Sequence, residues 1–261
     1  MENSLLRYLR NYIYAFRLKA NGFDYPIKII DKPYGRNTLV ISPHFDDEIF
    51  GCGGTLAKHV ALGDKVSIVY LTDSSNGISN IKNKKLVNKI RKKESIEALK
   101  IIGINKAYFL NEDDGVRSIK RKTIKSMVKI FYEIKPDLVY LPWFLDNHGD
   151  HIKANFVLLE VSKNYGLNFN VCAYEVWTPL IPNIIIDISD FYKIKKKASL
   201  CFKSQIKENN YIAGIFGLNK YRTMFGLKRA AYAEAFLYLP AKEYLKLFKL
   251  ADNKEKYEHK N

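Results

Sequence analysis

The sequence lacks the features that mark membrane-spanning, secreted and disulfide-linked proteins. No apolar stretch approaches the roughly 20 residues that a transmembrane helix needs. Residues 1–4 do not form a basic region that leads into a hydrophobic signal segment, so we expect a cytoplasmic protein. The three cysteines, Cys52, Cys172 and Cys201, lack the paired spacing of a cysteine zinc site. We interpret them as small buried apolar residues rather than as a disulfide framework.

Acidic residues are also scarce in relation to basic ones. The chain has 27 aspartates and glutamates against 43 lysines and arginines, a formal net charge of +16. Such an excess favours polyanionic partners: nucleic acid, an anionic membrane surface or phosphate-bearing substrates. A lysine-rich composition throughout the chain gives the same charge without any partner, so composition alone leaves both interpretations open.

The first part of the chain, residues 1–36, precedes the main domain. Over residues 5–18 the spacing predicts an amphipathic basic helix. This helix either packs on the core of the protein or binds an anionic lipid surface, which would make the protein peripheral at the inner face of the membrane. Its apolar stripe consists of Leu5, Leu9, Tyr12, Ile13 and Phe16.

From residue 37 onward, short apolar runs alternate with helical patterns. This alternation predicts βαβ units and a single Rossmann-like α/β domain over residues 37–250, with a predominantly parallel sheet and helices on both faces. The predicted strands are 38–42, 66–71, 107–110 and 138–142, and the predicted helices are 52–62, 85–102, 119–134 and 151–165.

The remainder of the chain gives weaker patterns. Extended segments are predicted at 171–177 and 184–188, a helix at 190–203, and a last strand at 233–239 followed by a short helix. We expect residues 204–229 to form a loop and a short helix at the mouth of the active site, where a sugar could stack on aromatic side chains. Residues 251–261 are expected to form a polar tail.

Histidine is rare, and its distribution is the most informative feature of the chain. Three of the five histidines fall in two clusters that each follow an apolar run. The first cluster contains His44, Asp46 and Asp47, and the second is the segment Asp146-Asn147-His148-Gly149-Asp150-His151. Ligands of parallel sheets bind beyond the carboxyl ends of the strands. We therefore expect the two clusters to meet there.

These residue types suit metal-assisted hydrolysis. His44, Asp47 and His151 could bind one zinc ion and leave a position for water. Asp46 points away from its neighbour Asp47, so it could accept a proton from that water. His148, with Asp150 nearby, could act as a cation or acid that meets negative charge on a substrate oxygen.

Two local alternatives accompany this interpretation. The carboxylates of Asp46 and Asp47 could instead cap the helix that follows them. The glycine-rich stretch 51–54 is expected to open that helix at a place where the backbone passes close to a bound group.

Three strings carry a family resemblance: Pro-His-Phe-Asp-Asp-Glu at 43–48, Gly-Cys-Gly-Gly-Thr-Leu at 51–56 and His-Gly-Asp-His at 148–151. They resemble the N-acetylglucosaminylphosphatidylinositol deacetylase (PIG-L) family, also called the LmbE-like zinc deacetylases, although Phe45 replaces the usual proline. The resemblance continues through Leu71-Thr72-Asp73, Arg91-Lys92-Lys93-Glu94 and Asp113-Asp114-Gly115, and covers roughly residues 37 to 165.

The resemblance implies a role for each matching residue. His44, Asp47 and His151 would hold a single zinc ion, Asp46 would be the general base, and His148 supported by Asp150 would stabilise the oxyanion. Arg91 and Asp114 match residues that contact the sugar. Asp146 stands where some members have a mobile tyrosine, and we include it among the candidate substrate contacts.

We therefore predict a zinc-dependent enzyme that removes the acetyl group from an N-acetylated amino sugar of the N-acetylglucosamine type, attached to a lipid, nucleotide or polysaccharide. Further candidate substrate contacts are Trp177 and Glu234, with Glu175 nearby; core packing and a strand-edge charge are the alternatives for these three. One rival interpretation is a metal-dependent hydrolase of another bond, such as a phosphoester. The other is a non-catalytic α/β protein that binds nucleotides or nucleic acid. The glycine stretch is not Gly-x-Gly-x-x-Gly and follows a His-Asp-Asp cluster that would repel phosphate without a metal, so we do not expect a nucleic-acid partner, although the basic charge keeps that alternative open.

Overall fold

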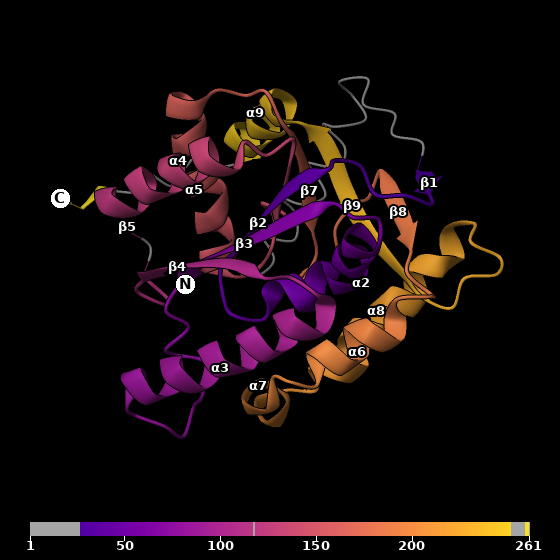
Figure 1. Ribbon diagram of the computed structural model, residues 1–261, viewed down its shortest axis with the longest axis horizontal. Coiled ribbons are helices and arrows are strands. Elements are labelled where there is room, and N and C mark those ends of the chain that lie inside the picture. Colours follow the sequence, from indigo (N-terminus) through magenta and orange to yellow (C-terminus); the bar gives the residue numbers. More distant parts are fainter. Residues whose placement is uncertain (1–26, 117, 252–258, 261) are drawn as a thin grey trace.

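The computed structural model describes residues 27–116, 118–251 and 259–260, and they form an α/β domain around one large sheet (Figure 1). The sheet has eight strands in the order β1-β8-β9-β7-β6-β2-β3-β4. All neighbouring strands run parallel except β9, which is antiparallel to both β7 and β8. The strands are β1 Lys28–Ile30, β2 Asn37–Ser42, β3 Lys65–Thr72, β4 Lys106–Glu112, β6 Leu138–Pro142, β7 Asn170–Tyr174, β8 Ile184–Asp187 and β9 Ala233–Pro240.

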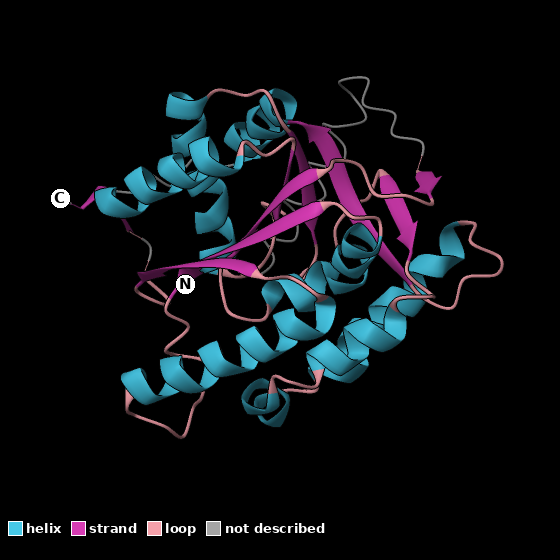
Figure 2. Cartoon of the chain, in the orientation of Figure 1, coloured by secondary structure: helices cyan, strands magenta, loops and turns pink. Residues whose placement is uncertain are grey.

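Helices cover both faces of this sheet (Figure 2). One face packs against α4, α5 and α9 in a core that includes Met127, Ala154 and Tyr244. The other face packs against α2, α3 and α6 around Ile49, Leu99 and others. The bounds are α2 Asp47–Ala61, α3 Lys84–Ile102, α4 Arg121–Ile134, α5 Gly149–Tyr165, α6 Tyr192–Ser199, α7 Lys203–Glu208, α8 Tyr211–Tyr221, the 3₁₀ helix η1 Arg222–Phe225 and α9 Ala241–Ala251.

The central strands carry apolar residues on both faces because both of their faces are buried. In β2, Leu39 and Ile41 belong to one core and Val40 belongs to the other. Successive side chains of a strand point to opposite faces of its sheet, so a strand between two helical layers needs apolar residues at every position. The predicted α/β fold with a mainly parallel sheet is therefore confirmed.

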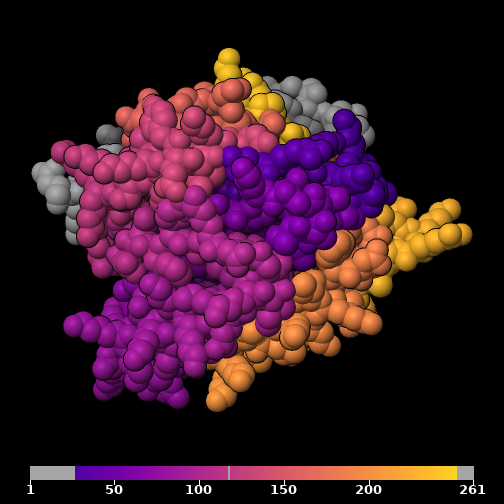
Figure 3. All heavy atoms as spheres, in the orientation of Figure 1, coloured from indigo at the N-terminus to yellow at the C-terminus, as the bar shows by residue number. Residues whose placement is uncertain are grey.

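The structure differs from the sequence-based expectation in the second half of the chain. The helix predicted over 190–203 ends at Ser199, because Phe202 leaves the helical conformation and buries its ring against Phe50. Residues 204–229 were expected to form a loop and a short helix, but most of them belong to α7, α8 and η1. In the space-filling view the orange residues, which include α6 and α7, lie beside the purple residues of α3 (Figure 3).

Two further differences concern the ends of the chain. The lead-in segment contributes β1, which extends the sheet by pairing with β8, and this strand was not predicted. In the expected polar tail, β10 (His259–Lys260) pairs in parallel with β5 (Ile119–Lys120). The amphipathic helix predicted over 5–18 lies outside the described residues and stays a prediction. Within the described residues, none of the helices combines the length and apolarity required to cross a bilayer.

Candidate active site

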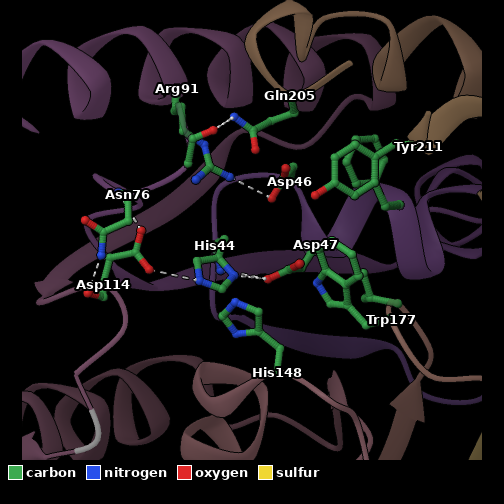
Figure 4. A pocket seen from close by; sticks show the side chains of 13 residues that line it. His44, Asp46, Asp47, Asn76, Arg91, Asp114, His148, Trp177, Gln205 and Tyr211 are labelled. Atoms are coloured by element: carbon green, nitrogen blue, oxygen red, sulfur yellow. Dashed lines mark hydrogen bonds and ion pairs between the residues drawn. The ribbon is translucent and has the colours of Figure 1, made fainter. Parts of the chain in front are cut away.

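The site lies where β2 and β6, two adjacent parallel strands, end at the same edge of the sheet. The segment after β2 carries the first cluster of candidate residues, and the segment between β6 and α5 carries the second. The structure brings these clusters together, as expected from the topology. The ring centroids of His44 and His151 are 5.6 Å apart, and the ring of His148 lies 4.7 Å from the first and 5.0 Å from the second. Figure 4 shows the rings of His44 and His148 next to each other.

Asp47 lies between two of these imidazoles. Its Oδ2 atom is 3.0 Å from His44 Nδ1 and 3.2 Å from His151 Nε2, and it also accepts a hydrogen bond from the backbone N–H of His44. Burial alone would raise the pKa of Asp47, but the adjacent His151 and His44 hold it well below its usual value. The carboxylate is therefore ionised and lies at the centre of the cluster.

His151 provides the test of whether a metal ion fits here. Its side chain is fully buried, and among the described residues neither ring nitrogen makes a hydrogen bond. Tetrahedral zinc with ligands at about 2.0–2.2 Å separates its ligand atoms by roughly 3.3 Å, which agrees with the spacing around Asp47. A buried imidazole without hydrogen-bond partners beside a carboxylate and a second imidazole suits a divalent ion.

The nitrogen and oxygen atoms of the cluster form more than one ligand-like group. Ligand atoms of His44, His148 and His151 lie within 4.8 Å of one another, and so do those of His44, Asp114 and Asp150. The first group shares two residues with the predicted set of His44, Asp47 and His151. Neither group contains Asp47, although its Oδ2 atom lies close to both His44 and His151.

Asp46 points to the opposite side of its backbone, toward Arg91. The carboxylate is buried, and its Oδ1 atom accepts a hydrogen bond of 3.1 Å from Arg91 Nη2. The same guanidinium donates to the backbone oxygen of Ser74, so its position is fixed. Asp46 occupies the N-cap position of α2, but its side chain makes no capping hydrogen bond, so capping does not explain this carboxylate. Burial raises the pKa of Asp46, while Arg91 opposes that shift.

His148 differs from the expected cation. It is the N-cap of α5, and its Nδ1 atom accepts a hydrogen bond of 3.2 Å from the backbone N–H of Asp150. The neutral ring then carries its proton on Nε2. Burial and the nearby His44 and His151 lower the pKa of His148 to about 4, so the ring is neutral near pH 7.

The carboxylate of Asp150 does not support His148 in the expected way. Its Oδ2 atom is 3.9 Å from His148 Nδ1, beyond hydrogen-bond distance, and 3.4 Å from His44 Nε2. Instead, the carboxylate pairs with Lys153 at 2.6 Å and accepts a hydrogen bond from the backbone of Gly115. The residue orients His148 through its backbone N–H only.

Three of the five candidate substrate contacts line a pocket of about 130 Å³ next to these residues. They are Arg91, Asp114 and Trp177. Asp114 lies 3.3 Å from His44 Nε2 and accepts a hydrogen bond from the backbone of Asn76. Trp177 is 48 % exposed and forms part of the outer wall.

Asp146 and Glu234 lie outside this pocket, as does Glu175, because each is a buried internal anchor. Asp146 accepts hydrogen bonds from the backbone of His148 and Trp177 and lies 3.4 Å from His151 Nδ1. Glu234 binds the backbone N–H groups of Gly54 and Thr55 and pairs with Lys195; Glu175 pairs with Arg222. All three carboxylates are bound by groups in the protein interior. A single acidic residue in a sequence does not show whether its carboxylate has such partners.

The glycine stretch also has a different role from the one expected. It lies inside α2, which begins at Asp47, but the helix is kinked at Cys52, so the second segment of the helix does start within the glycine stretch. A Cβ atom on Gly51 would lie 2.3 Å from the ring of Tyr174, and one on Gly54 would lie 2.6 Å from Ile188. Glycine is needed here because the helix packs closely on its own protein, not on a ligand.

The pocket contains residues that sequence reasoning missed. Gln205 and Tyr211 form its wall from α7 and α8, and Asn76 and Phe50 also line it. The Tyr211 ring stacks on Phe50 with centroids 5.1 Å apart, and burial raises the pKa of Tyr211 to about 12, so its hydroxyl stays protonated. The only signal for these residues was the tyrosine content of the segment 204–229.

Comparisons with known proteins give a family match over the segment that contains both motif clusters. The family model described as GlcNAc-PI de-N-acetylase, PIG-L, matches residues 39–162. A relative from Thermococcus kodakarensis, diacetylchitobiose deacetylase, is 28% identical over 219 residues, which are 76% of this chain and 80% of the relative.

Solved structures share the fold at lower identity. The N,N'-diacetylchitobiose deacetylase from Pyrococcus horikoshii superposes with a TM-score of 0.70 at 24% identity, covering 94% of this chain and 95% of that one. GalB, the 4-carboxy-2-hydroxymuconate hydratase from Pseudomonas putida, superposes with a TM-score of 0.67 at 20% identity, covering 77% and 95%. Because the fold occurs in a deacetylase and in a hydratase, the fold by itself does not define the reaction. The family match is confined to residues 39–162, the segment that carries the His-Asp-Asp and His-Gly-Asp-His motifs, and there the chain is similar to the PIG-L family.

Proposed function

We propose that the protein is a zinc-dependent N-deacetylase that hydrolyses the acetamide of an N-acetylated amino sugar and releases acetate. One observation carries the proposal: a buried His-Asp-His cluster lies beside a second buried carboxylate that an arginine holds in place. The relative from Thermococcus kodakarensis, named a diacetylchitobiose deacetylase, supports the same substrate class.

His44, Asp47 and His151 are the residues that would hold the ion, one per chain. A bound divalent ion would polarise the acetamide carbonyl and lower the pKa of water to about 7. The ring nitrogens of His151, which make no hydrogen bond within the described residues, and the ionised Asp47 support this assignment. Asp47 and Asp146 raise the pKa of His151 to about 9, so a bound ion would have to displace a proton from that ring.

Asp46 is the proposed general base. Its carboxylate lines the pocket, and burial raises its pKa, which brings it closer to the value that suits a proton acceptor near neutral pH. The Arg91 guanidinium fixes the carboxylate at Oδ1 and leaves Oδ2 for the attacking water. After the attack, the same carboxylic acid can give its proton to the departing amine.

His148 is the proposed hydrogen-bond donor to the acetamide oxygen. Because its Nδ1 accepts the N–H of Asp150, the neutral ring presents Nε2–H toward the pocket. A donor fixed in this way can stabilise the negative charge that develops on the carbonyl oxygen without reorganising during the reaction. The neutral form suits this role better than the cation that we expected from the sequence.

The direct test is acetate release from a panel of N-acetylated sugars, with N-acetylglucosamine and N,N'-diacetylchitobiose first, measured with and without a chelator. We expect acetate to appear with the metal-loaded protein and to stop when the chelator removes the ion. Restoring zinc should restore turnover. Failure to release acetate from any acetylated sugar in the panel, by protein shown to contain the ion, would contradict the proposal.

A hydrolase of another bond with two metal ions is the second candidate. The group formed by His44, Asp114 and Asp150 is the observation that favours it. However, Lys153 already pairs with Asp150 at 2.6 Å, and a second cation would have to displace it. Mass spectrometry of the native protein distinguishes the two: one ion per chain favours the deacetylase, and two ions with phosphoester turnover favour the rival.

A further inference from the structure

The outer wall of the pocket comes from segments that the family match does not include. The match ends at residue 162, whereas Trp177, Gln205 and Tyr211 all follow it. Figure 4 shows Gln205 beside Arg91 on one side of the pocket and Trp177 beside His148 on the other, with Tyr211 between these sides. Any recognition by these three residues is therefore a property of this chain rather than of the matched segment.

Trp177 is an exposed aromatic residue on an anchored loop, the segment 175–183. Its backbone N–H donates to Asp146 Oδ2 at 3.1 Å, and the next residue, Thr178, accepts hydrogen bonds from Trp143 Nε1 and from the backbone of Asn147. Farther along, the Arg222 guanidinium joins Glu175 to the backbone oxygen of Leu180. These hydrogen bonds fix the loop, whereas Trp177 itself is 48 % exposed. The loop therefore positions the indole ring where a ligand can contact it.

The ring of Trp177 lies next to the rings of His148 and Tyr211. It lies nearly parallel to the ring of His148, at 22° and 6.4 Å between centroids, and the ring of Tyr211 meets it edge-on at 5.6 Å. A pyranose has an apolar face of C–H groups and a polar rim. Flat aromatic surfaces in a pocket bind such a face, while a few polar groups set its orientation.

Gln205 supplies a suitable polar group on the opposite wall. Its side chain is 4 % exposed, and Nε2 donates to the backbone oxygen of Gly77 at 2.9 Å. Because a carbonyl can only accept, the amide orientation is fixed and Oε1 faces away from Gly77. Among the described residues, none donates a hydrogen bond to this oxygen. The neighbouring Ser204 binds Glu94 of α3 through both its backbone and its hydroxyl, which holds the start of α7 in place.

The charges of the pocket indicate a neutral ligand. Within the described part of the chain, Arg91 is the one lining residue with a permanent positive charge, and it is already bonded to Asp46 and Ser74. The excess of lysine and arginine that gives the chain its net charge of +16 is therefore not found in the lining of the pocket where the sugar would bind. Recognition of an anionic group at this wall would need an unpaired cation that the described lining does not contain.

We propose that Trp177 and Gln205 form a carbohydrate platform, in which the indole stacks on the apolar face of a neutral pyranose and the Gln205 amide oxygen accepts a hydrogen bond from one of its hydroxyls. This inference rests on the proposed function, because the platform would hold the sugar whose acetamide reaches Asp46 and His148. It goes beyond that function by assigning the two contacts that select the ring.

The first experiment measures binding without turnover. The Asp46→Asn variant is titrated with N,N'-diacetylchitobiose, and with acetamide as a ligand that has no ring, while intrinsic tryptophan fluorescence is followed. The sugar should change the emission of Trp177, and this change should be absent in the Asp46→Asn, Trp177→Phe double variant, which retains only the buried Trp143. No response to the sugar, or an equal response to acetamide, would overturn the platform.

The second experiment uses kinetics. Trp177→Ala should raise KM for the sugar about ten-fold with little change in kcat, as expected when a contact stabilises ground and transition states equally. Ile181→Ala, on the same loop and equally exposed but outside the pocket lining, is the matched control and should leave KM unchanged. A KM that stays within two-fold in Trp177→Ala, or rises equally in Ile181→Ala, would refute stacking.

The test of Gln205 combines a variant with changes in the ligand. Gln205→Leu should raise KM about three- to ten-fold, as for one neutral hydrogen bond. With a series of deoxy analogues of the sugar, one analogue should lose affinity for the wild type and show no further loss in Gln205→Leu. If Gln205→Leu does not fold, the wild-type series still shows which hydroxyl is read. Equal effects on every analogue would mean that Gln205 has only a structural role.

The outcomes separate this inference from the proposed function. Trp177-dependent sugar binding without acetate release by the wild type would leave the platform standing and refute the deacetylase. If the wild type releases acetate and the KM is unchanged in both the Trp177 and the Gln205 variants, the deacetylase stands and the platform is refuted. KM should also be insensitive to added salt if the recognised ring is neutral; a steep salt dependence would indicate an anionic group and contradict the platform.

Discussion

The inner floor and the outer wall of the pocket differ in residue type and in origin. The floor consists of charged and titratable side chains, such as His44, Asp46 and Asp47, in the segment that the family model matches. The wall consists of neutral residues, such as Trp177 and Gln205, from later segments. Buried charges at a strand edge create reactivity, because low dielectric strengthens each interaction, whereas neutral contacts discriminate between ligands of similar charge.

The two regions are joined by buried carboxylates. Glu234, on β9, binds two backbone N–H groups of α2, the helix that begins at Asp47. Asp146 lies next to His151 and also binds the backbone of Trp177. Substitutions in the floor, in the wall and at these connections should therefore have different consequences, and they can be ranked by expected size.

The largest effect is expected from Asp46→Asn, in the floor. Without a carboxylate to accept a proton, kcat should fall by about 10²- to 10⁴-fold, while the bound ion and the KM change little. Acetate release and a metal count on the same sample check this. Asp113→Asn, a neighbouring carboxylate that is exposed and outside the pocket lining, serves as the control. Turnover in Asp46→Asn close to that of the control would refute the assigned base.

The next effect is on stability, at the connection through β9. Glu234→Gln should leave the buried Lys195 ammonium without its charged partner, although Asn219 still accepts a hydrogen bond from it, and breaking such a pair costs about 3–5 kcal/mol of unfolding free energy. Urea unfolding followed by circular dichroism measures the change. Glu133→Gln, which removes the exposed ion pair with Lys106, should be indistinguishable from the wild type. Equal midpoints for the two variants would mean that Glu234 does not hold the regions together.

A smaller effect is expected from Asp146→Asn. Its carboxylate lies 3.4 Å from the outer nitrogen of His151, and partners of this kind typically contribute about 10- to 100-fold in metal affinity. Competition with a fluorescent zinc chelator measures this without any turnover. Asp64→Asn is the matched control because Asp64 contacts the buried His59, which is not part of the site, at 2.8 Å. Unchanged zinc affinity in Asp146→Asn would exclude the carboxylate from the metal site.

The contrast between floor and wall also determines what the sequence could predict. Apolar runs and strand-end motifs predicted the parallel sheet and the convergence of His44 with His151, because local patterns and one topological rule suffice for both. The partners of Asp146 and Glu234 could not be predicted, since each carboxylate is saturated by backbone groups far away in the sequence.

Of the wall, Trp177 was a candidate substrate contact in the sequence, but Gln205 and Tyr211 were missed for a related physical reason. Gln205 and Tyr211 lie on two short helices whose positions depend on tertiary contacts, such as the binding of Ser204 by Glu94, rather than on a periodic apolar pattern. The charge state of His148, expected to be a cation, was also misjudged, because its N-cap hydrogen bond and its lowered pKa follow from its position at the start of α5 among two other imidazoles.

The smallest effect is expected where a helix supports the floor from a distance. Asn83 caps α3 by accepting a hydrogen bond from the backbone of Leu86, and Asn83→Ala should cost about 1 kcal/mol of unfolding free energy. Arg91 lies two turns farther along and is held by Ser74 and Asp46, so fraying of the first turn should leave kcat and KM unchanged. Thermal unfolding and acetate release on one preparation check both parts. If kcat fell together with stability, the position of Arg91 would depend on the first turn of α3. Its hydrogen bonds to Ser74 and Asp46 would then not be sufficient to hold it in the floor of the pocket.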